Sequence, residues 1–141
     1  MSILVTGGAG FIGSHTCVEL LNAGYDIVIV DNLYNSSEKS LDRVKELTGK
    51  DFSFYPYDIR DKENMRKVFE NHKIDACIHF AGLKAVGESC AKPLEYYDNN
   101  IGGTLALCEV MREYNCKKIV FSSSATVYGS SNISPLREDM K

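Results

Sequence analysis

The chain has 141 residues, of which 44% are hydrophobic and 25% charged, as in one globular domain and unlike a disordered chain. Its net charge of −3 argues against nucleic acid as a partner, and its apolar runs are far shorter than the ~20 residues that cross a membrane. Early glycines without a basic segment before them indicate no secretory signal peptide. Five cysteines without a Cys-x-x-Cys pair fit a reduced, cytoplasmic protein with no metal site.

Short apolar runs alternate with helix-like segments along the chain. In chain order, the patterns predict a strand at 3–5, a helix at 11–23, a strand at 27–30, a helix at 41–47, a strand at 52–55, a helix after an N-cap at Asp61, a strand at 76–80, a loop at 81–91, a helix at 97–113 and a strand at 119–121. Such alternation favours parallel strands joined by right-handed crossovers. The predicted fold class is therefore α/β, a doubly wound parallel sheet in a single domain, residues 1–141.

The last residues add no element that closes the sheet. The tail from Pro135 to Lys141 is polar and turn-like in composition. We therefore expect the chain to be the N-terminal part of a longer enzyme, ending before the last strands of the sheet and before a C-terminal substrate domain.

A glycine pattern, Gly7-x-x-Gly10-x-x-Gly13, lies between the first predicted strand and the first predicted helix. Glycines there let the backbone approach a pyrophosphate at the positive end of the helix. Asp31 comes at the end of the second predicted strand, ~20 residues after the middle glycine, where a carboxylate can bind the adenosine ribose of a dinucleotide. The alternatives are a tight turn that binds nothing and a solvated acid, but the two features in register favour the dinucleotide. No Arg or Lys occurs in the next five residues, which favours NAD over NADP.

Two further segments follow predicted strands at the edge where doubly wound sheets bind ligands. Asp58, beside Ile59, could accept a hydrogen bond from the adenine amino group, or it could cap the next helix. The small residues Ala81 and Gly82 after Phe80 would let the backbone pass close to a ligand, or they could form an ordinary turn.

The run of residues 5–15 resembles the glycine fingerprint of the extended short-chain dehydrogenase/reductase family. Within that family, residues 31–36, 79–89, 92–100 and 122–129 are similar to stretches of the UDP-glucose (UDP-galactose) 4-epimerases. The resemblance covers residues 1–129 and is weak beyond them. It implies a Rossmann-type NAD-binding fold, a UDP-hexose substrate, a role in galactose metabolism and a homodimer. In these enzymes NAD takes hydride from C4 and returns it to the opposite face of a 4-keto sugar.

The resemblance also implies the residues of the site. NAD would be bound by Gly7, Gly10, Phe11, Ile12, Gly13, Asp31, Asn32, Leu33, Asn35, Ser36, Asp58, Ile59, Phe80, Ala81, Gly82, Lys84, Asn99 and Ser122. The substrate would contact Lys84, Ser124, Ala125 and Thr126. Ser124 would be catalytic, orienting the reacting sugar hydroxyl and helping to pass its proton. As alternatives, Lys84 could be a solvated charge, Asn99 a helix cap and Ser124 a small residue at a strand end.

The region before Val127-Tyr128-Gly129 distinguishes among members of this family. Dehydratases and decarboxylases place acidic residues there, whereas this chain has Ser124-Ala125-Thr126, which favours the epimerases. The family's base, a tyrosine in Tyr-x-x-x-Lys, is absent, because Asn132 stands four residues after Tyr128. The chain by itself is therefore expected to be inactive. The alternatives are a stand-alone NAD-binding module and another nucleotide-sugar epimerase of the same family.

The long predicted helix around residues 100–114 is one of those that the resemblance assigns to the dimer interface. Leu105, Leu107, Cys108 and Met111 give it more apolar surface than one face of a sheet obviously covers, although core packing explains most of that surface. Without its partner helix, the chain alone is expected to expose this face and aggregate.

Overall fold

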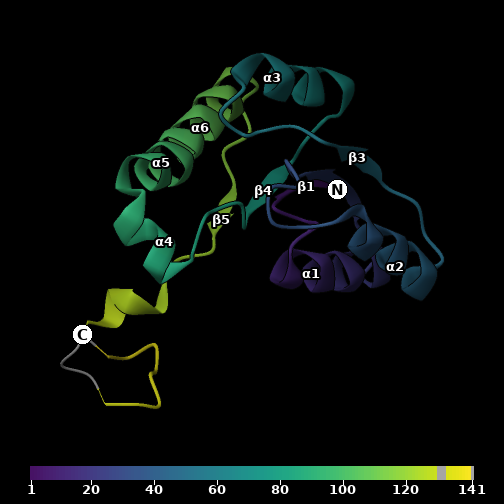
Figure 1. Ribbon diagram of the computed structural model, residues 1–141. Helices are drawn as coiled ribbons and strands as arrows, with labels where there is room; N and C mark the ends of the chain where they lie inside the picture. The colour runs from purple at the N-terminus through teal and green to yellow at the C-terminus, as the bar shows by residue number, and fades with distance from the viewer. Residues whose placement is uncertain (130–132, 141) are drawn as a thin grey trace.

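The computed structural model describes residues 1–129 and 133–140 and has a five-stranded parallel sheet at its centre (Figure 1). The strands are β1 (Ser2–Thr6), β2 (Asp26–Val30), β3 (Ser53–Tyr55), β4 (Ala76–His79) and β5 (Ile119–Phe121). Their order in the sheet is β3-β2-β1-β4-β5, and every pair is parallel. From β1 at the centre, β2 and β3 are added on one side of the sheet, and β4 and β5 are then added on the other side. The predicted doubly wound α/β fold is confirmed.

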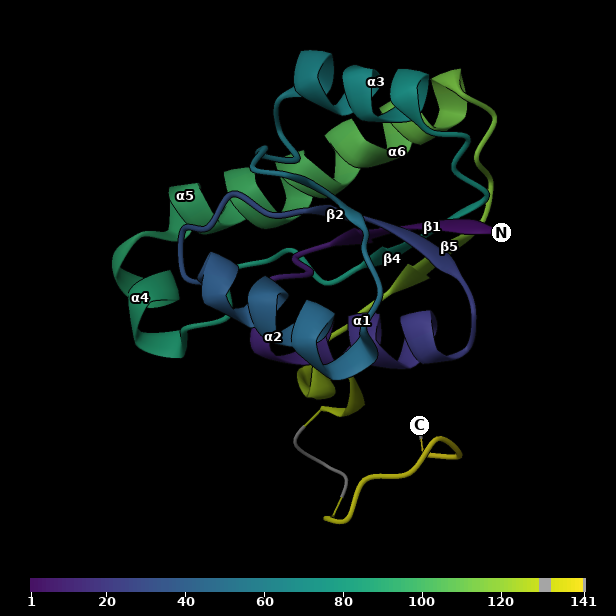
Figure 2. The same cartoon turned by 90° about the vertical axis from the view of Figure 1, so that its right-hand side faces the viewer.

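Helices cover both faces of this sheet. Helices α1 (Phe11–Asn22) and α2 (Glu38–Thr48) pack on one face, while α3 (Lys62–Asn71) and α6 (Gly103–Glu113) pack on the other (Figure 2). Alternating side chains of β1 serve the two layers, because Ile3 and Val5 face the α1 side and Leu4 faces the α3 side. The sheet is therefore buried on both faces, which explains the almost uninterrupted apolar runs in its central strands.

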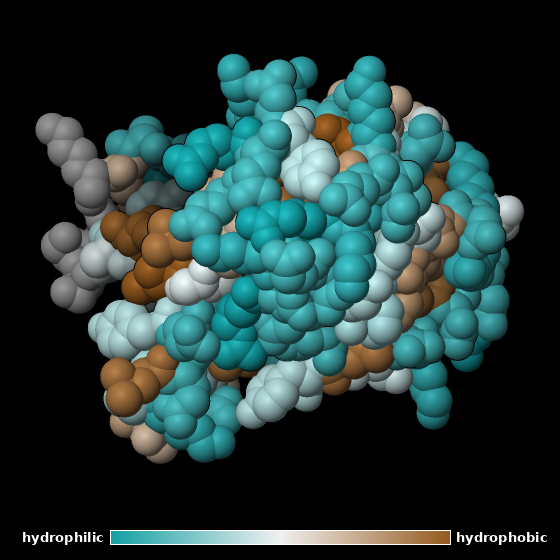
Figure 3. Space-filling view, turned by 90° about the horizontal axis from the view of Figure 1, so that it is seen from above, coloured by the Kyte–Doolittle hydropathy of each residue, from teal (hydrophilic) through white to brown (hydrophobic). Residues whose placement is uncertain are grey.

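The outer surface over α3 and α6 is mostly hydrophilic (Figure 3). Ion pairs join these helices across it, for example Arg66 Nε to Glu113 Oε2 at 2.7 Å. No helix in the described parts of the chain combines the length and the apolar character that a membrane span requires.

The segment between β4 and α6 differs from the prediction. The predicted loop at 81–91 contains a short helix, α4 (Val86–Ala91), which buries no side chain and therefore leaves no apolar periodicity in the sequence. The predicted helix at 97–113 is preceded by α5 (Pro93–Tyr97), with proline in its first turn, and joins it through a π-helical turn, η1 (Asp98–Gly102). The helical region thus begins at Pro93, earlier than predicted, and contains a π-helical turn at 98–102.

The final elements lie at the open side of the sheet. All three residues of β5 are exposed, with Val120 at 63%, and β5 pairs only with β4 in the described part of the chain. A 3-10 turn, η2 (Ala125–Tyr128), follows it.

Candidate functional site

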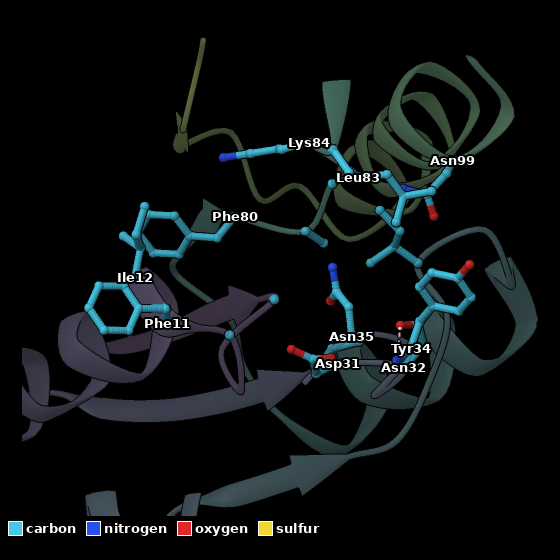
Figure 4. A pocket seen from close by; sticks show the side chains of 18 of the residues that line it. Phe11, Ile12, Asp31, Asn32, Tyr34, Asn35, Phe80, Leu83, Lys84 and Asn99 are labelled. Carbon is cyan, nitrogen blue, oxygen red and sulfur yellow. Dashed lines mark hydrogen bonds between the residues drawn. The ribbon is translucent and has the colours of Figure 1, made fainter. Parts of the chain in front are cut away.

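A cleft of about 380 Å³ lies at the carboxyl edge of the sheet, where the strand order reverses between β1 and β4 (Figure 4). Segments that follow β1, β2, β3 and β4 form its walls together with η1. The predicted site residues that line it are Gly7, Gly10, Phe11, Ile12, Gly13, Asp31, Asn32, Asn35, Ile59, Phe80, Ala81, Gly82, Lys84 and Asn99. The structure therefore gathers most of the predicted cofactor residues around one cavity.

The turn after β1 is so tightly packed that side chains do not fit. Gly7 has a φ of +70°, and a Cβ there would lie 2.6 Å from the Ala81 nitrogen. A Cβ on Gly13 would lie 2.2 Å from the Gly7 carbonyl oxygen. Gly10 precedes α1 and supplies no side-chain cap, so the first N–H groups of the helix keep their capacity to bind a ligand. This turn has the form of an anion-binding cradle.

Asp31 ties the glycine turn to the segment after β2. Its buried carboxylate accepts hydrogen bonds from Ala9 N at 3.0 Å, Leu33 N at 2.9 Å and Ser36 Oγ at 2.8 Å. Leu33 has a φ of 57°, a strained conformation for leucine that its bond to Asp31 helps to hold. Leu33 packs against the core and Ser36 supports Asp31, and neither lines the cleft. A carboxylate has about four acceptor positions, so this one retains capacity for a ribose hydroxyl.

At the β3 side of the cleft, Asp58 belongs to a polar network behind Ile59. It accepts hydrogen bonds from Asn32 Nδ2 at 3.0 Å and from Arg60 Nη2 at 2.8 Å, and Arg60 also reaches Asp98 of η1. The hydrogen bond from Arg60 is the main cause that lowers the pKa of Asp58 to about 2.

The alternative that Asp58 caps the next helix is wrong. Asp61 caps α3, and its carboxylate accepts from Asn64 N at 3.1 Å. Arg60 escaped the sequence analysis because nothing in its local pattern reveals a partner on η1.

On the opposite wall, residues 80–84 follow β4 and face the glycine turn. Lys84 is exposed and extends toward the side of the cleft that holds Phe80 and Ile12 (Figure 4). Asn99 enters from η1 and donates a hydrogen bond from Nδ2 to Asn100 Oδ1 at 2.9 Å. Asn99 therefore does not sit at a helix start, and the capping alternative for it is wrong because the helix begins at Pro93.

Of the predicted substrate residues, Lys84 lines this cleft, whereas Ser124 lies apart from it. Ser122 and Ser124 line a second cavity, of about 600 Å³, which shares residues 80–84 with the cleft as a common wall. Ser124 caps η2, because its Oγ accepts from Thr126 N at 3.2 Å and lies 2.8 Å from Thr126 Oγ1. Thr126 lines neither cavity, and the side chain of Ala125 lies outside the description.

Several lining residues were missed. They are Val30, Tyr57 and Ala85; Tyr34 and Leu83 also line the cleft and fall within residues 31–36 and 80–84, which the resemblance implies border the cofactor. All lie within or beside segments that the sequence analysis predicted to bind the cofactor, so their closeness in sequence to Asp31, Ile59 and Lys84 could have identified them.

The cysteines do not contribute to the site. All five are free, and burial raises the pKa of Cys17 to about 12. Within the described residues, no group of three or more His, Cys, Asp or Glu side chains is arranged to hold a metal ion. The polar groups that line these cavities are hydroxyl, amide, carboxylate and lysine side chains and the imidazole of His79, which lines the second cavity.

Comparisons with known proteins agree with this arrangement. Residues 3–141 match the NAD dependent epimerase/dehydratase family. The chain is 66% identical over 139 residues to the UDP-glucose 4-epimerase of Bacillus subtilis (strain 168) and 59% identical to that of Haemophilus influenzae, covering 99% of this chain and 41% of each relative. It superposes on the UDP-glucose 4-epimerase from Bifidobacterium longum, crystallised in complex with NAD+ and UDP, with a TM-score of 0.95 and 57% identity, covering 100% of this chain and 42% of that one.

The chain thus spans about two fifths of the length of these relatives. The match to the family extends from the first strand through the glycine turn, the cleft and the segment after β5. We conclude that the chain belongs to the NAD dependent epimerase/dehydratase family.

Proposed function

We propose that this chain is the NAD-binding part of an enzyme that interconverts UDP-glucose and UDP-galactose. The sugar would be oxidised at C4 to a 4-keto sugar and reduced again on the opposite face. The observation that carries the proposal is the convergence of the glycine turn, Asp31 and residues 80–84 on one cleft. The names of the relatives support the substrate. The activity is proposed for a polypeptide of the relatives' length, and the 141-residue chain, which lacks Tyr-x-x-x-Lys, is proposed to be inactive alone.

The glycine turn and the start of α1 would together bind the pyrophosphate of a dinucleotide. A Cβ on Gly7 would collide with the backbone of Ala81, and one on Gly13 with the Gly7 carbonyl oxygen, so glycine at both positions lets the turn close into a cradle that would hold the pyrophosphate. The backbone of Phe11 and Ile12, at the start of α1, would bind the phosphate oxygens through the free N–H groups. Bound NAD would supply the acceptor and donor of hydride for the sugar.

Asp31 would select NAD rather than NADP. Its buried carboxylate repels a phosphate on the adenosine ribose, and residues 32–36 contain no cation to offset the repulsion. Lys84 is the one basic side chain among the described residues that line the cleft, and it comes from the opposite wall. It would therefore bind the nicotinamide ribose or the pyrophosphate.

The UDP-hexose would occupy the second cavity, on the other side of residues 80–84. Ser124 would orient the reacting hydroxyl, because its Oγ is already held by Thr126 N and lies beside the Thr126 hydroxyl. A hydroxyl fixed in this way can accept a proton on one side while donating on the other. Ser122 and Lys84 line the same cavity and would bring it into contact with the cofactor.

The helical region after α4 presents a stripe suited to a second copy of the chain. Exposed apolar side chains recur there at spacings of three and four residues: Leu94, Tyr97, Ile101, Leu105 and Cys108. Leu107 and Met111, which the sequence offered as part of this surface, are buried in the core and are not available to a partner. We propose a homodimer through this stripe and, from the free thiols, a cytoplasmic location.

An activity assay on the polypeptide expressed from the natural gene tests the proposal. UDP-galactose should be converted to UDP-glucose without net production of NADH. Binding of NAD without conversion would instead support a stand-alone binding module. Faster conversion of UDP-N-acetylgalactosamine would indicate another nucleotide-sugar epimerase.

Cofactor choice is tested separately with one charge change. Asp31→Asn should weaken NAD binding and narrow its preference over NADP, as measured by fluorescence titration. Asp42→Asn removes the same charge from an exposed position on α2 and should leave both affinities unchanged. An unmodified protein that binds NADP as tightly as NAD would contradict the role given to Asp31.

A further inference from the structure

A buried histidine that the proposed function does not use lies at the end of β4. His79 is 1% exposed. Its Nδ1 lies 2.6 Å from Thr6 Oγ1 on β1, and its Nε2 lies 3.0 Å from Thr104 Oγ1 on α6. Thr104 Oγ1 is in turn 2.6 Å from the carbonyl oxygen of Asn100 on η1. One continuous chain of hydrogen bonds therefore crosses from the centre of the sheet to the π-helical turn.

The chemistry of these groups fixes the direction of every bond in the chain. A carbonyl oxygen only accepts, so Thr104 donates its proton to Asn100 and can only accept from His79. Nε2 of His79 must therefore carry the proton. In a neutral imidazole Nδ1 then accepts, and Thr6 donates to it. For a neutral His79, the chain of hydrogen bonds is satisfied in one arrangement only, with the proton on Nε2.

Both ends of this chain hold the segment of residues 80–84. Asn100 Oδ1 accepts from Leu83 N at 2.8 Å, and Asn100 Nδ2 donates to Leu83 O at 2.8 Å. At the other end, Ala81 N lies 3.5 Å from Thr6 Oγ1, the outer limit of a hydrogen bond. Because Asn100 satisfies both backbone groups of Leu83, it holds that residue as a neighbouring strand would.

We propose that His79 and Asn100 are positioning residues, which together hold residues 80–84 as a rigid wall between the two cavities. The inference rests on the proposed function, since the wall would separate and align cofactor and sugar. The π-helical turn is part of the device, because it places Asn99 toward the cleft and Asn100 against Leu83 from consecutive positions. Such turns occur frequently at functional sites. Reacting groups must be held within about 0.5 Å of the productive geometry, and a rigid wall between the two cavities would favour such alignment.

Two threonine variants separate the positioning role of this hydrogen-bond network from the general effect of losing a threonine hydroxyl. Thr104→Val removes the acceptor for His79 and the bond to Asn100 while conserving side-chain size. Thr48→Val is the matched control, because Thr48 Oγ1 also donates to a carbonyl four residues earlier, Val44 O at 2.8 Å, on α2 and away from the cleft. In the protein expressed from its natural gene, Thr104→Val should weaken NAD binding about tenfold, equivalent to ~1.4 kcal/mol. Thr48→Val should change it less than twofold.

Asn100→Ala provides a second variant, with a loss of NAD affinity at least as large as that of Thr104→Val. A spectroscopic measurement on the unmodified protein is independent of both variants. The imidazole ¹⁵N shifts should show that His79 is protonated on Nε2 alone. The signals of His79 are assigned by their loss in His79→Gln. Protonation on Nδ1 would overturn the inference, as would equal NAD affinities for Thr104→Val and Thr48→Val. If the unmodified protein does not bind NAD, the proposed function fails and this inference fails with it.

Discussion

Substitution of Gly13 by alanine tests the packing that forms the cradle. The added Cβ would lie 2.2 Å from Gly7 O, 2.8 Å from Gly8 Cα and 3.0 Å from Gly7 C, whereas ordinary contacts begin near 3.4 Å. Backbone atoms must therefore move by about 1 Å, which corresponds to the upper end of overpacking costs, roughly 3 kcal/mol. Alanine recovers about 1 kcal/mol of helix propensity. The net loss in the free energy of unfolding is about 2 kcal/mol, or a fall in Tm of roughly 7 °C.

Thermal and urea unfolding of the variant measure this loss, and NAD titration measures its effect on the cradle. Gly87→Ala is the matched control, since Gly87 lies in α4 and a Cβ added there would have no atom within 4 Å, so this variant should become more stable by about 0.5–1 kcal/mol. If Gly13→Ala is as stable as the unmodified protein and binds NAD equally well, the close packing of α1 against the turn does not explain why residue 13 is glycine.

Three other measurements follow from the structure. Burial lowers the pKa of His79, so the unfolded chain takes up a proton more readily than the folded one, and the free energy of unfolding should decrease as pH falls below about 6.5; a free energy in urea unfolding that does not vary from pH 7 to 5 would refute this. The hydrogen bond from Arg60 lowers the pKa of Asp58 to about 2, so the ionised carboxylate stabilises the folded protein above pH 3.8, and this stabilisation is lost as pH falls through about 2. Arg60→Gln should therefore raise the midpoint of an NMR titration of the Asp58 carboxyl. A thiol reagent should modify the exposed Cys90 promptly and Cys17 only on unfolding; equal rates would contradict the burial of Cys17.

The sequence predicted those parts of the fold and cleft that depend on local pattern. Apolar runs with helical segments between them identified all five strands, most clearly β1 and β2, because parallel strands buried on both faces are continuously apolar. The glycines and Asp31 were found from their positions at strand ends, where the topology brings them together. The roles assigned to Ser124 and to the other site residues stay predictions.

The remainder depends on contacts between residues far apart in sequence. Arg60 joins Asp58 to Asp98, and Asn100 holds Leu83, yet no local periodicity marks either residue as a bridge. The π-helical turn was likewise not predicted, because nothing in the apolar pattern of residues 98–102 distinguishes it from an α-helix. Helix α4 was missed because it buries nothing.

The position of β1 at the centre of the sheet has a consequence for how the protein is made. Ile3 pairs with Ile27 on one side and with Ala76 on the other. During synthesis the first strand can acquire one neighbour early, but its second neighbour, β4, emerges only after residues 76–79 have been made. Gly7 lies against Ala81, so the cradle also lacks its opposite wall until then. A nascent chain therefore holds an apolar strand edge open for that interval, and the cofactor can assist folding only once residues 80–84 have been made.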